Sequence, residues 1–200
     1  MPSRGIEAGV PYRPSLAGGH RRDFTSETRA PTRERPSLGG KQLIRQTTPE
    51  DIPALIALAE GTGVFKPLEV VALREVLDDY FAFDHEQGHR SLTYERRGRP
   101  IGFAYSAPAA MTDRTWYLYW IAVAKLSQAQ GIGTELLRSA EAEIRRHSGR
   151  VLLIETSSLS HYEPTRRFYL KHGYEQAAVI RDFYADGDDL IVFRKRMLSP

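Results

Sequence analysis

The chain has 200 residues, of which 41% are hydrophobic and 26% charged, a balance typical of globular proteins. It contains no cysteine, which excludes disulfides, cysteine-based zinc sites and a cysteine nucleophile. No apolar run approaches the ~20 residues that span a bilayer, and the N-terminus lacks an apolar signal core, so we expect a cytoplasmic protein with no membrane partner. A net charge of +3 is too small to indicate binding to nucleic acid.

The first 40 residues differ in composition from the rest of the chain. They are rich in Gly, Pro, Ser and Arg and have no apolar periodicity. We expect residues 1–40 to be a disordered tail, because little apolar surface offsets the entropy of ordering them. The alternatives are a basic arm for an acidic partner and extra residues from an upstream start codon. The folded domain is expected over residues 41–200.

Capping residues and apolar spacing predict the first elements of this domain. Thr48 is a favourable helix cap, Pro49 suits the first helical position, and Gly61 is expected to end the helix. These signals predict a strand over residues 42–45, a helix over 49–60, a loop over 61–66 and a second helix over 68–81.

His85-Glu86-Gln87-Gly88-His89 contains the His-Glu-x-x-His pattern of zinc proteases. That chemistry needs both histidines on one face of a helix. Gly88 lies inside the pattern and a strand is expected from Ser91, so a helix has no room here. We therefore predict a polar loop and no metal site.

The remaining chain alternates between apolar strands and short helices. Residues 151–156 are almost wholly apolar, as in a strand that is buried on both faces. We expect a hairpin of strands 91–96 and 101–106 through residues 97–100, strand 116–123, helix 132–146, strand 151–156, helix 164–172, and strands 175–181 and 189–196 joined by a loop over 182–188.

A glycine-containing turn follows the strand over 116–123 and leads into a helix. The first turn of a helix has unpaired N–H groups and a partial positive charge, so it can hold a phosphate. No Lys follows Gly133, which excludes a P-loop, and Leu136 stands where a dinucleotide-binding fingerprint needs a third Gly or Ala. The segment Gln128-Ala129-Gln130-Gly131-Ile132-Gly133 resembles the pyrophosphate loop of the GNAT acetyltransferases. The alternative is an ordinary strand-to-helix turn.

A second signature makes this resemblance closer. Phe168-Tyr169 followed by Gly173-Tyr174 is similar to the Phe-Tyr-x-x-x-Gly-Phe/Tyr pattern of the same family. The resemblance covers roughly residues 41–197 and implies an α/β (α+β) GNAT fold. Its central sheet is mixed and mostly antiparallel with helices on both faces, in the order β-α-α-β-β-β-α-β-α-β-β.

The resemblance implies acetyl-CoA as co-substrate and no metal. In the family, the strand edge pairs with the pantetheine amides and the loop N–H groups hold the pyrophosphate. Tyr162 stands where many members have an Asn that bonds the pantetheine arm, which puts that contact in doubt. The implied cofactor-binding residues are Ile121, Ala122, Val123, Ala129, Gln130, Gly131, Ile132, Gly133 and Thr134.

Two side chains are candidates for the chemistry of acyl transfer. Tyr169 matches the family's catalytic acid; a phenol with a pKa of about 10 can protonate a thiolate whose acid has a pKa of about 8.5. The alternative is an aromatic pair with Phe168. Glu155 is a lone carboxylate in an apolar strand, and desolvation would raise its pKa as a general base requires. The alternative is a Glu that pairs with a neighbouring Arg.

The acceptor is the substrate that the sequence defines least. We expect an N-acetyltransferase, monomeric or homodimeric, that acts on a primary amine of a small molecule or amino acid. The alternatives are a protein N-terminus or lysine, or a CoA-binding regulatory module without turnover. Residues 181–184 are similar to the Arg-Asn-Tyr-Tyr of ribosomal-protein N-terminal alanine acetyltransferases. The candidate acceptor residues are Phe65, Lys66, Asp182, Tyr184, Asp186, Asp188 and Asp189.

Overall fold

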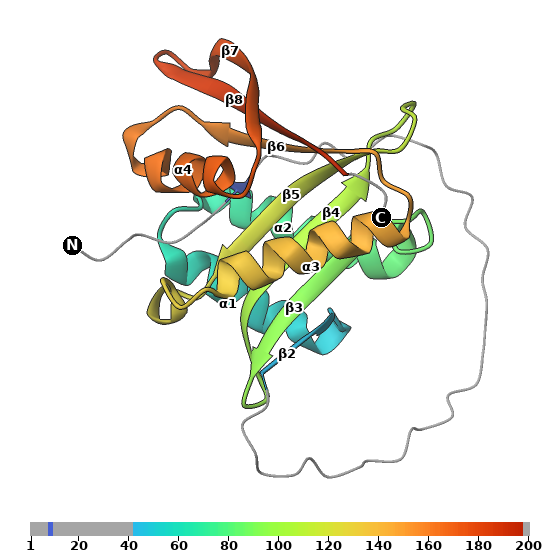
Figure 1. Cartoon of the computed structure of the whole chain (residues 1–200). Helices are drawn as coiled ribbons and strands as arrows, with labels where there is room; N and C mark the ends of the chain where they lie inside the picture. Colours follow the sequence, from blue (N-terminus) through green and yellow to red (C-terminus); the bar gives the residue numbers. More distant parts are fainter. Residues whose placement is uncertain (1–7, 10–41, 198–200) are drawn as a thin grey trace.

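The computed structural model describes residues 8–9 and 42–197, and its elements are shown in Figure 1. The expectation of a disordered tail falls outside the described residues, apart from a two-residue strand, β1 (Ala8–Gly9). The strands after it are β2 (Gln42–Gln46), β3 (Arg90–Arg96), β4 (Arg99–Pro108), β5 (Thr115–Val123), β6 (Val151–Ser157), β7 (Glu175–Ala185) and β8 (Asp188–Arg196). The α-helices are α1 (Ile52–Thr62), α2 (Pro67–Asp79), α3 (Ile132–Arg146) and α4 (Glu163–Lys171).

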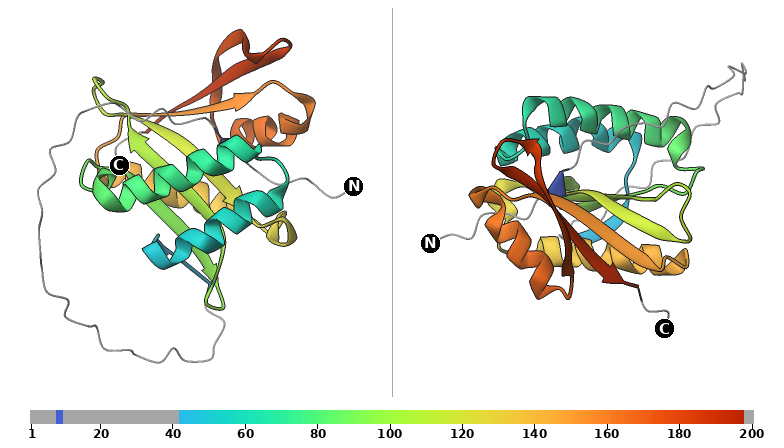
Figure 2. Two further views of the ribbon diagram at one scale, coloured as in Figure 1. Left: turned by 180° about the vertical axis from the view of Figure 1, so that it is seen from behind. Right: turned by 90° about the horizontal axis from the view of Figure 1, so that it is seen from above.

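From β2 onward, the element order is the predicted one. The sheet runs β2-β3-β4-β5-β6-β8-β7, and within it only β5 and β6 pair in parallel. Figure 2 shows α1 and α2 on one face of the sheet and α3 and α4 on the other. The prediction of a mixed, mostly antiparallel sheet with helices on both faces is therefore confirmed.

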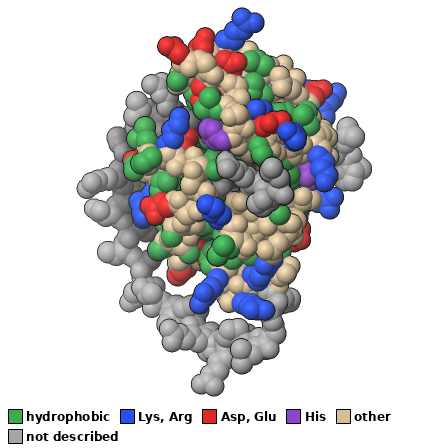
Figure 3. Space-filling model, turned by 90° about the vertical axis from the view of Figure 1, so that its left-hand side faces the viewer, with side chains coloured by type: hydrophobic (Ala, Val, Ile, Leu, Met, Phe, Trp, Pro, Cys, Tyr) green, Lys and Arg blue, Asp and Glu red, His purple; other side chains and the backbone are tan. Residues whose placement is uncertain are grey.

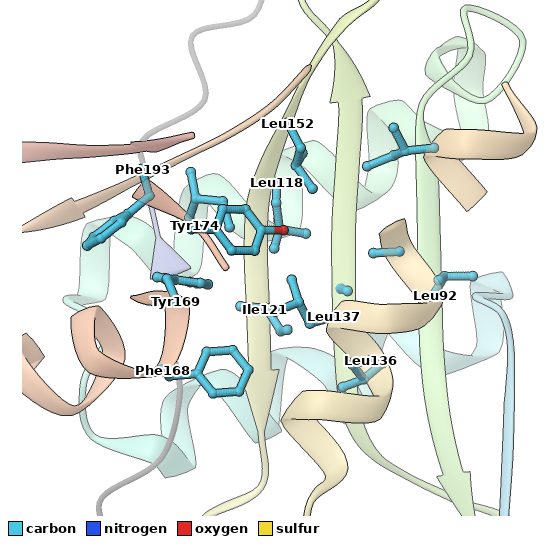
Figure 4. Close-up of a cluster of buried hydrophobic side chains, with 14 of the residues drawn as sticks. Leu92, Leu118, Ile121, Leu136, Leu137, Leu152, Phe168, Tyr169, Tyr174 and Phe193 are labelled. Atoms are coloured by element: carbon cyan, nitrogen blue, oxygen red, sulfur yellow. The ribbon is translucent and has the colours of Figure 1, made fainter. Parts of the chain in front are cut away.

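Two hydrophobic cores flank the sheet. The larger core lies under α3 and α4 and is shown in Figure 4. The second lies under α1 and α2 and includes Trp120 and Tyr105. In α3 the apolar residues recur every three or four positions, which places them on one face. The buried members of that face include Ile132, Leu136, Leu137, Ala140 and Ile144.

Helix α1 does not end at Gly61, contrary to the prediction. It continues to Thr62 and is capped by Gly63, whose φ of +72° is the left-handed conformation that favours glycine. The exposed Gly61 stays within the helix, where glycine costs some stability but does not break the hydrogen bonding.

Both hairpins are tighter than predicted. The β3–β4 turn consists of Arg97 and Gly98 alone, each with positive φ, as a two-residue primed turn requires. Most of the loop predicted over residues 182–188 is strand, because β7 runs to Ala185. Asp182 has a φ of +51° within a register shift of β7 against β8, so a strand irregularity stands where turn residues predicted a loop.

The predicted polar loop before the hairpin is present as a turn over residues 85–88, and residues 85–87 are exposed. Asp84 ends a short π-helical turn (Tyr80–Asp84), and both Asp84 and His89 are buried. His89 Nδ1 lies 2.7 Å from the Tyr105 hydroxyl and 3.3 Å from an Asp84 carboxylate oxygen. His85 is exposed, and Gly88 has a φ of +96°, so the two histidines do not share a helix.

Neither a membrane span nor a metal cluster is found in the described part of the chain. No helix within residues 42–197 combines the length and apolar character needed to cross a bilayer. No group of three or more metal-ligating side chains occurs among the described residues.

Candidate active site

A bulge in β5 sets the geometry of the candidate site. Tyr105 of β4 pairs with Trp120 and Ser106 pairs with Leu118, so Tyr119 is an extra residue in β5. An extra residue bends a strand and shifts its alternation by one. Before the bulge Leu118 faces the α3 core, whereas after it Ile121 and Val123 do.

Strand β5 leaves β6 just before this bulge. The two strands pair only at residues 115–117 of β5 and 151–153 of β6. Beyond Tyr117 the edge of β5 is no longer bonded to β6. We call the edge of β5 beyond Tyr117, together with the part of β6 that follows Leu153, the β5–β6 slot. Strand β1 pairs with that edge at Trp120 and Ile121, and an extended ligand with amide groups can bond it in the same way.

The N-terminus of α3 lies at the end of β5. Gly131 caps the helix with a φ of +85°, and Ala129 has a φ of +61°. Residues 129–131 are exposed, and the first helical bond runs from the Glu135 N–H to the Gly131 carbonyl. The N–H groups of the first turn therefore lack helical partners and are available to bond an anion.

Side chains hold this loop in place and add positive charge near it. Gln128 Nε2 donates to the Val123 carbonyl at 3.0 Å, and Arg96 Nη1 donates to Gln130 Oε1 at 2.9 Å. Figure 3 shows Lys and Arg side chains at the lower end of this side of the molecule, over the β3–β4 hairpin. Arg97 and Arg99 of that hairpin are exposed. The setting suits a ligand that carries several phosphates.

The residues expected to bind acetyl-CoA fall into two groups, one in strand β5 and one in the loop and first turn of α3. Ile121, Ala122 and Val123 are at most 2% exposed, so their side chains fill the cores and only their backbone can meet a ligand. The Thr134 hydroxyl lies 3.1 Å from His172 Nε2. Since His172 Nδ1 faces the Phe168 carbonyl and must donate to it, Nε2 accepts from Thr134. This bond ties the start of α3 to the end of α4.

Glu155 lies on the α1/α2 face of β6. Leu152 and Ile154 belong to the α3 core, and alternation along the strand turns Glu155 to the opposite side. Burial raises the pKa of the Glu155 carboxyl, while a hydrogen bond from the Tyr117 hydroxyl acts in the opposite direction. The Arg pairing considered as an alternative is not among the described ion pairs.

Two tyrosines surround this carboxyl. Tyr117 of β5 hydrogen-bonds Glu155, and its pKa is raised by burial and then by that carboxylate. The pKa of Tyr184 in β7 is raised far more, by burial and by the negative charges of Glu155 and Asp188. Within the described residues, the buried Tyr184 hydroxyl has no hydrogen-bond partner.

Two further carboxylates lie near Tyr184, but both have structural partners. Glu69 accepts from the Lys66 N–H at 2.6 Å and so caps α2. Asp188 accepts from the Ser157 hydroxyl. Among the described residues, the hydrogen-bond partner of Glu155 is the Tyr117 hydroxyl alone, so Glu155 is the carboxylate best able to exchange a proton with a ligand.

Tyr169 lies on the other face of the sheet from Glu155. It is fully buried in the α3 core, with its ring 5.6 Å from that of Phe193 and 5.7 Å from that of Tyr174 (Figure 4). The two candidate catalytic residues therefore approach the sheet from opposite sides. The β5–β6 slot is where a ligand from one face can meet a ligand from the other.

Sequence reasoning missed Tyr117 as the partner of Glu155 and missed the bulge at Tyr119. From the sequence, Tyr117 is only a residue that could flank the acceptor or fill space. Its position opposite the start of β6 follows from the parallel register and is not visible in residue spacing. Tyr162, in the place of the expected Asn, is buried beside the start of α4.

The chain is similar to known acetyltransferases in both sequence and structure. A family model for the acetyltransferase (GNAT) domain matches residues 87–176. A protein assigned to the GNAT family from Desulfovibrio desulfuricans is 33% identical, with a TM-score of 0.76 over 79% of this chain and 100% of that chain. Comparison with curated proteins gave no match.

More distant solved structures share the fold. The ribosomal-protein-S18-alanine N-acetyltransferase of Escherichia coli is 19% identical, with a TM-score of 0.64 over 80% of this chain and 96% of that chain. An aminoglycoside 6'-N-acetyltransferase complexed with coenzyme A is 17% identical, with a TM-score of 0.67 over 79% of this chain and 98% of that chain.

Proposed function

Because the chain belongs to the GNAT family of acetyltransferases, we propose that it moves an acetyl group from acetyl-CoA to a primary amine by direct attack in a ternary complex. The observation that supports this most strongly is the β5–β6 slot. It has the anion-binding start of α3 at its mouth and a carboxyl of raised pKa on the opposite face. The reaction draws on acetyl-CoA, and we place it in the cytoplasm.

In this proposal the donor enters from the side of α3. The N–H groups of residues 131–134 hold the pyrophosphate, and the arginines of the β3–β4 hairpin add attraction for phosphate. The pantetheine arm carries two amides, which bond the edge of β5 at residues 121–123. A main-chain N–H there meets the thioester oxygen as it becomes an oxyanion.

The acceptor enters from the side of α1 and α2. Glu155 takes the proton from the ammonium group, directly or through water, and the neutral amine attacks the thioester carbon. A raised pKa makes the carboxylate a better base for this step. Tyr117 orients the carboxylate, and the unpartnered Tyr184 hydroxyl is placed to bond the acceptor.

Collapse of the tetrahedral intermediate releases the thiolate of CoA. The nitrogen loses its remaining extra proton to water, Tyr169 donates its proton to the thiolate to give the CoA thiol, and the phenolate is reprotonated from solvent.

We propose a small-molecule amine or an amino acid as the acceptor. A protein N-terminus is the second candidate, favoured by the position of residues 181–184 in β7, with Tyr184 near Glu155. In both cases we assign catalysis to residues 41–200.

Binding of CoA to glycine variants of the full chain tests the donor half. Gly131→Glu places a carboxylate at the start of α3 and is expected to weaken CoA binding at least tenfold in calorimetry. Gly63→Glu is the matched control, because Gly63 is also exposed, has positive φ and has nothing within 4 Å of where a Cβ would lie. Equal affinity of the two variants would show that the anion site is elsewhere.

A further inference from the structure

The chain's own N-terminal strand lies in the β5–β6 slot. Strand β1 pairs antiparallel with β5, with Ala8 opposite Ile121 and Gly9 opposite Trp120, and it also packs against β6. It is the dark blue arrow in Figures 1 and 2. A segment more than 100 residues away in sequence thus occupies the edge that β5 exposes after leaving β6.

The edge of β5 that β1 occupies overlaps the edge at which we propose that acetyl-CoA binds. The pantetheine arm and a peptide strand make the same demand, namely extended amides that bond the backbone of β5. Both reach Ile121, and one row of N–H and C=O groups cannot bond two chains at once. Binding of one therefore requires departure of the other.

We propose that the β5–β6 slot is a docking site for the N-terminal strand, and that β1 closes the site until acetyl-CoA displaces it. This inference rests on the proposed function. A two-residue strand adds only about two backbone hydrogen bonds, each worth about a fivefold change in an equilibrium. The strand therefore lowers the apparent affinity for CoA about 5- to 30-fold without abolishing it.

Two double variants of the full chain test the competition. Alternate residues of an antiparallel strand bond the neighbouring strand, so replacing both Ala8→Pro and Gly9→Pro removes the bonding N–H whichever residue carries it. The control, Ala8→Ser with Gly9→Ser, keeps both N–H groups. Calorimetry with CoA is expected to give 5- to 30-fold tighter binding for the proline variant and wild-type affinity for the control.

Amide hydrogen exchange on the wild-type chain gives a second readout that needs no variant. Addition of CoA is expected to speed exchange in the peptide containing residues 8–9 while residues 120–123 stay protected. Tight CoA binding with unchanged affinity in the proline variant, or protection of residues 8–9 in the CoA complex, would overturn the docking proposal alone. Absence of CoA binding in all three proteins would overturn the proposed function with it.

Discussion

The Glu155 carboxyl is subject to two opposing influences. Burial raises its pKa, and the Tyr117 hydrogen bond lowers it, with burial the larger cause. A base is active when ionised, so activity is expected to rise as the pH climbs through the raised pKa. The strand position that makes Glu155 costly to bury is what makes it suitable as a base.

Tyr117→Phe removes the hydrogen bond that favours the ionised carboxylate. The pKa of Glu155 then rises further, and the acidic limb of kcat/KM is expected to move to higher pH. The measurement is a pH–rate profile of the variant and of the wild type. A limb that stays in place, or moves to lower pH, would show that Tyr117 does not act on the base.

Glu155→Gln is expected to have opposite effects on activity and stability. Loss of the base should lower kcat/KM about 10²- to 10⁴-fold. Because its pKa is raised on folding, wild-type Glu155 binds its proton more tightly in the folded chain, so stability falls as the pH rises through the unfolded and then the folded pKa. The Gln variant lacks this penalty.

Calorimetric unfolding at two pH values checks the stability side. The Gln variant should melt above the wild type at pH 7.5, and the difference should shrink below about pH 4, where a free Glu is protonated. An inactive variant that is also less stable at pH 7.5 would mean that Glu155 has a structural role.

Tyr169→Phe keeps the ring that packs against Phe193 and Tyr174 and removes only the hydroxyl. We expect kcat to fall about 10²-fold or more, as for loss of a general acid, with little change in CoA affinity. Steady-state kinetics together with calorimetry separate the two quantities. Full activity in the variant would remove Tyr169 from the mechanism and leave it as a core residue.

At the scale of elements, α1 ends two residues later than the helix predicted from the sequence. Gly61 lies inside the helix with nothing within 4 Å of an added Cβ, whereas Gly63 caps it with positive φ. Gly61→Ala is expected to stabilise the chain by about 0.5–1 kcal/mol, and Gly63→Ala to destabilise it by about 1–2 kcal/mol. Urea unfolding measures both, and the reverse order would place the helix end at Gly61.

Strand β5 shows why part of the site could not be predicted from the sequence. Residues 116–123 are aromatic or aliphatic throughout, so both faces read as buried and a one-residue bulge leaves no visible break in the alternation. The bulge at Tyr119 depends on the partner register in β4, which is tertiary information. The glycine turn before α3, by contrast, is local, and its helix was predicted with the observed bounds.

Strand β7 differs from its prediction for a related reason. Asp182, Asp186, Gly187 and Asp188 are typical turn residues, yet only Asp186 and Gly187 form the turn. Residues 181–184 are unpaired in the register with β8, yet they continue β7, and Tyr184 lies near Glu155. Local propensity predicted where the chain reverses only to within a few residues.

At the scale of the whole molecule, the two faces of the sheet have separate tasks in this account. In the proposed mechanism, the α3 side takes the donor and carries Tyr169 as the acid, and the α1/α2 side takes the acceptor and carries Glu155 as the base. The order of elements followed from the sequence because two motifs fixed the positions of α3 and α4 within a known order. The N-terminal strand in the slot did not, because residues 1–40 contain no apolar pattern that predicts pairing.

The most direct test is release of free CoA thiol from acetyl-CoA by the full chain, against a panel of small amines, amino acids and peptides, with mass spectrometry of the products. We expect release that depends on the amine, an acetylated product, and loss of both in Glu155→Gln. Tight binding of acetyl-CoA with no amine-dependent release from any class in the panel would contradict it and favour a CoA-binding regulatory module.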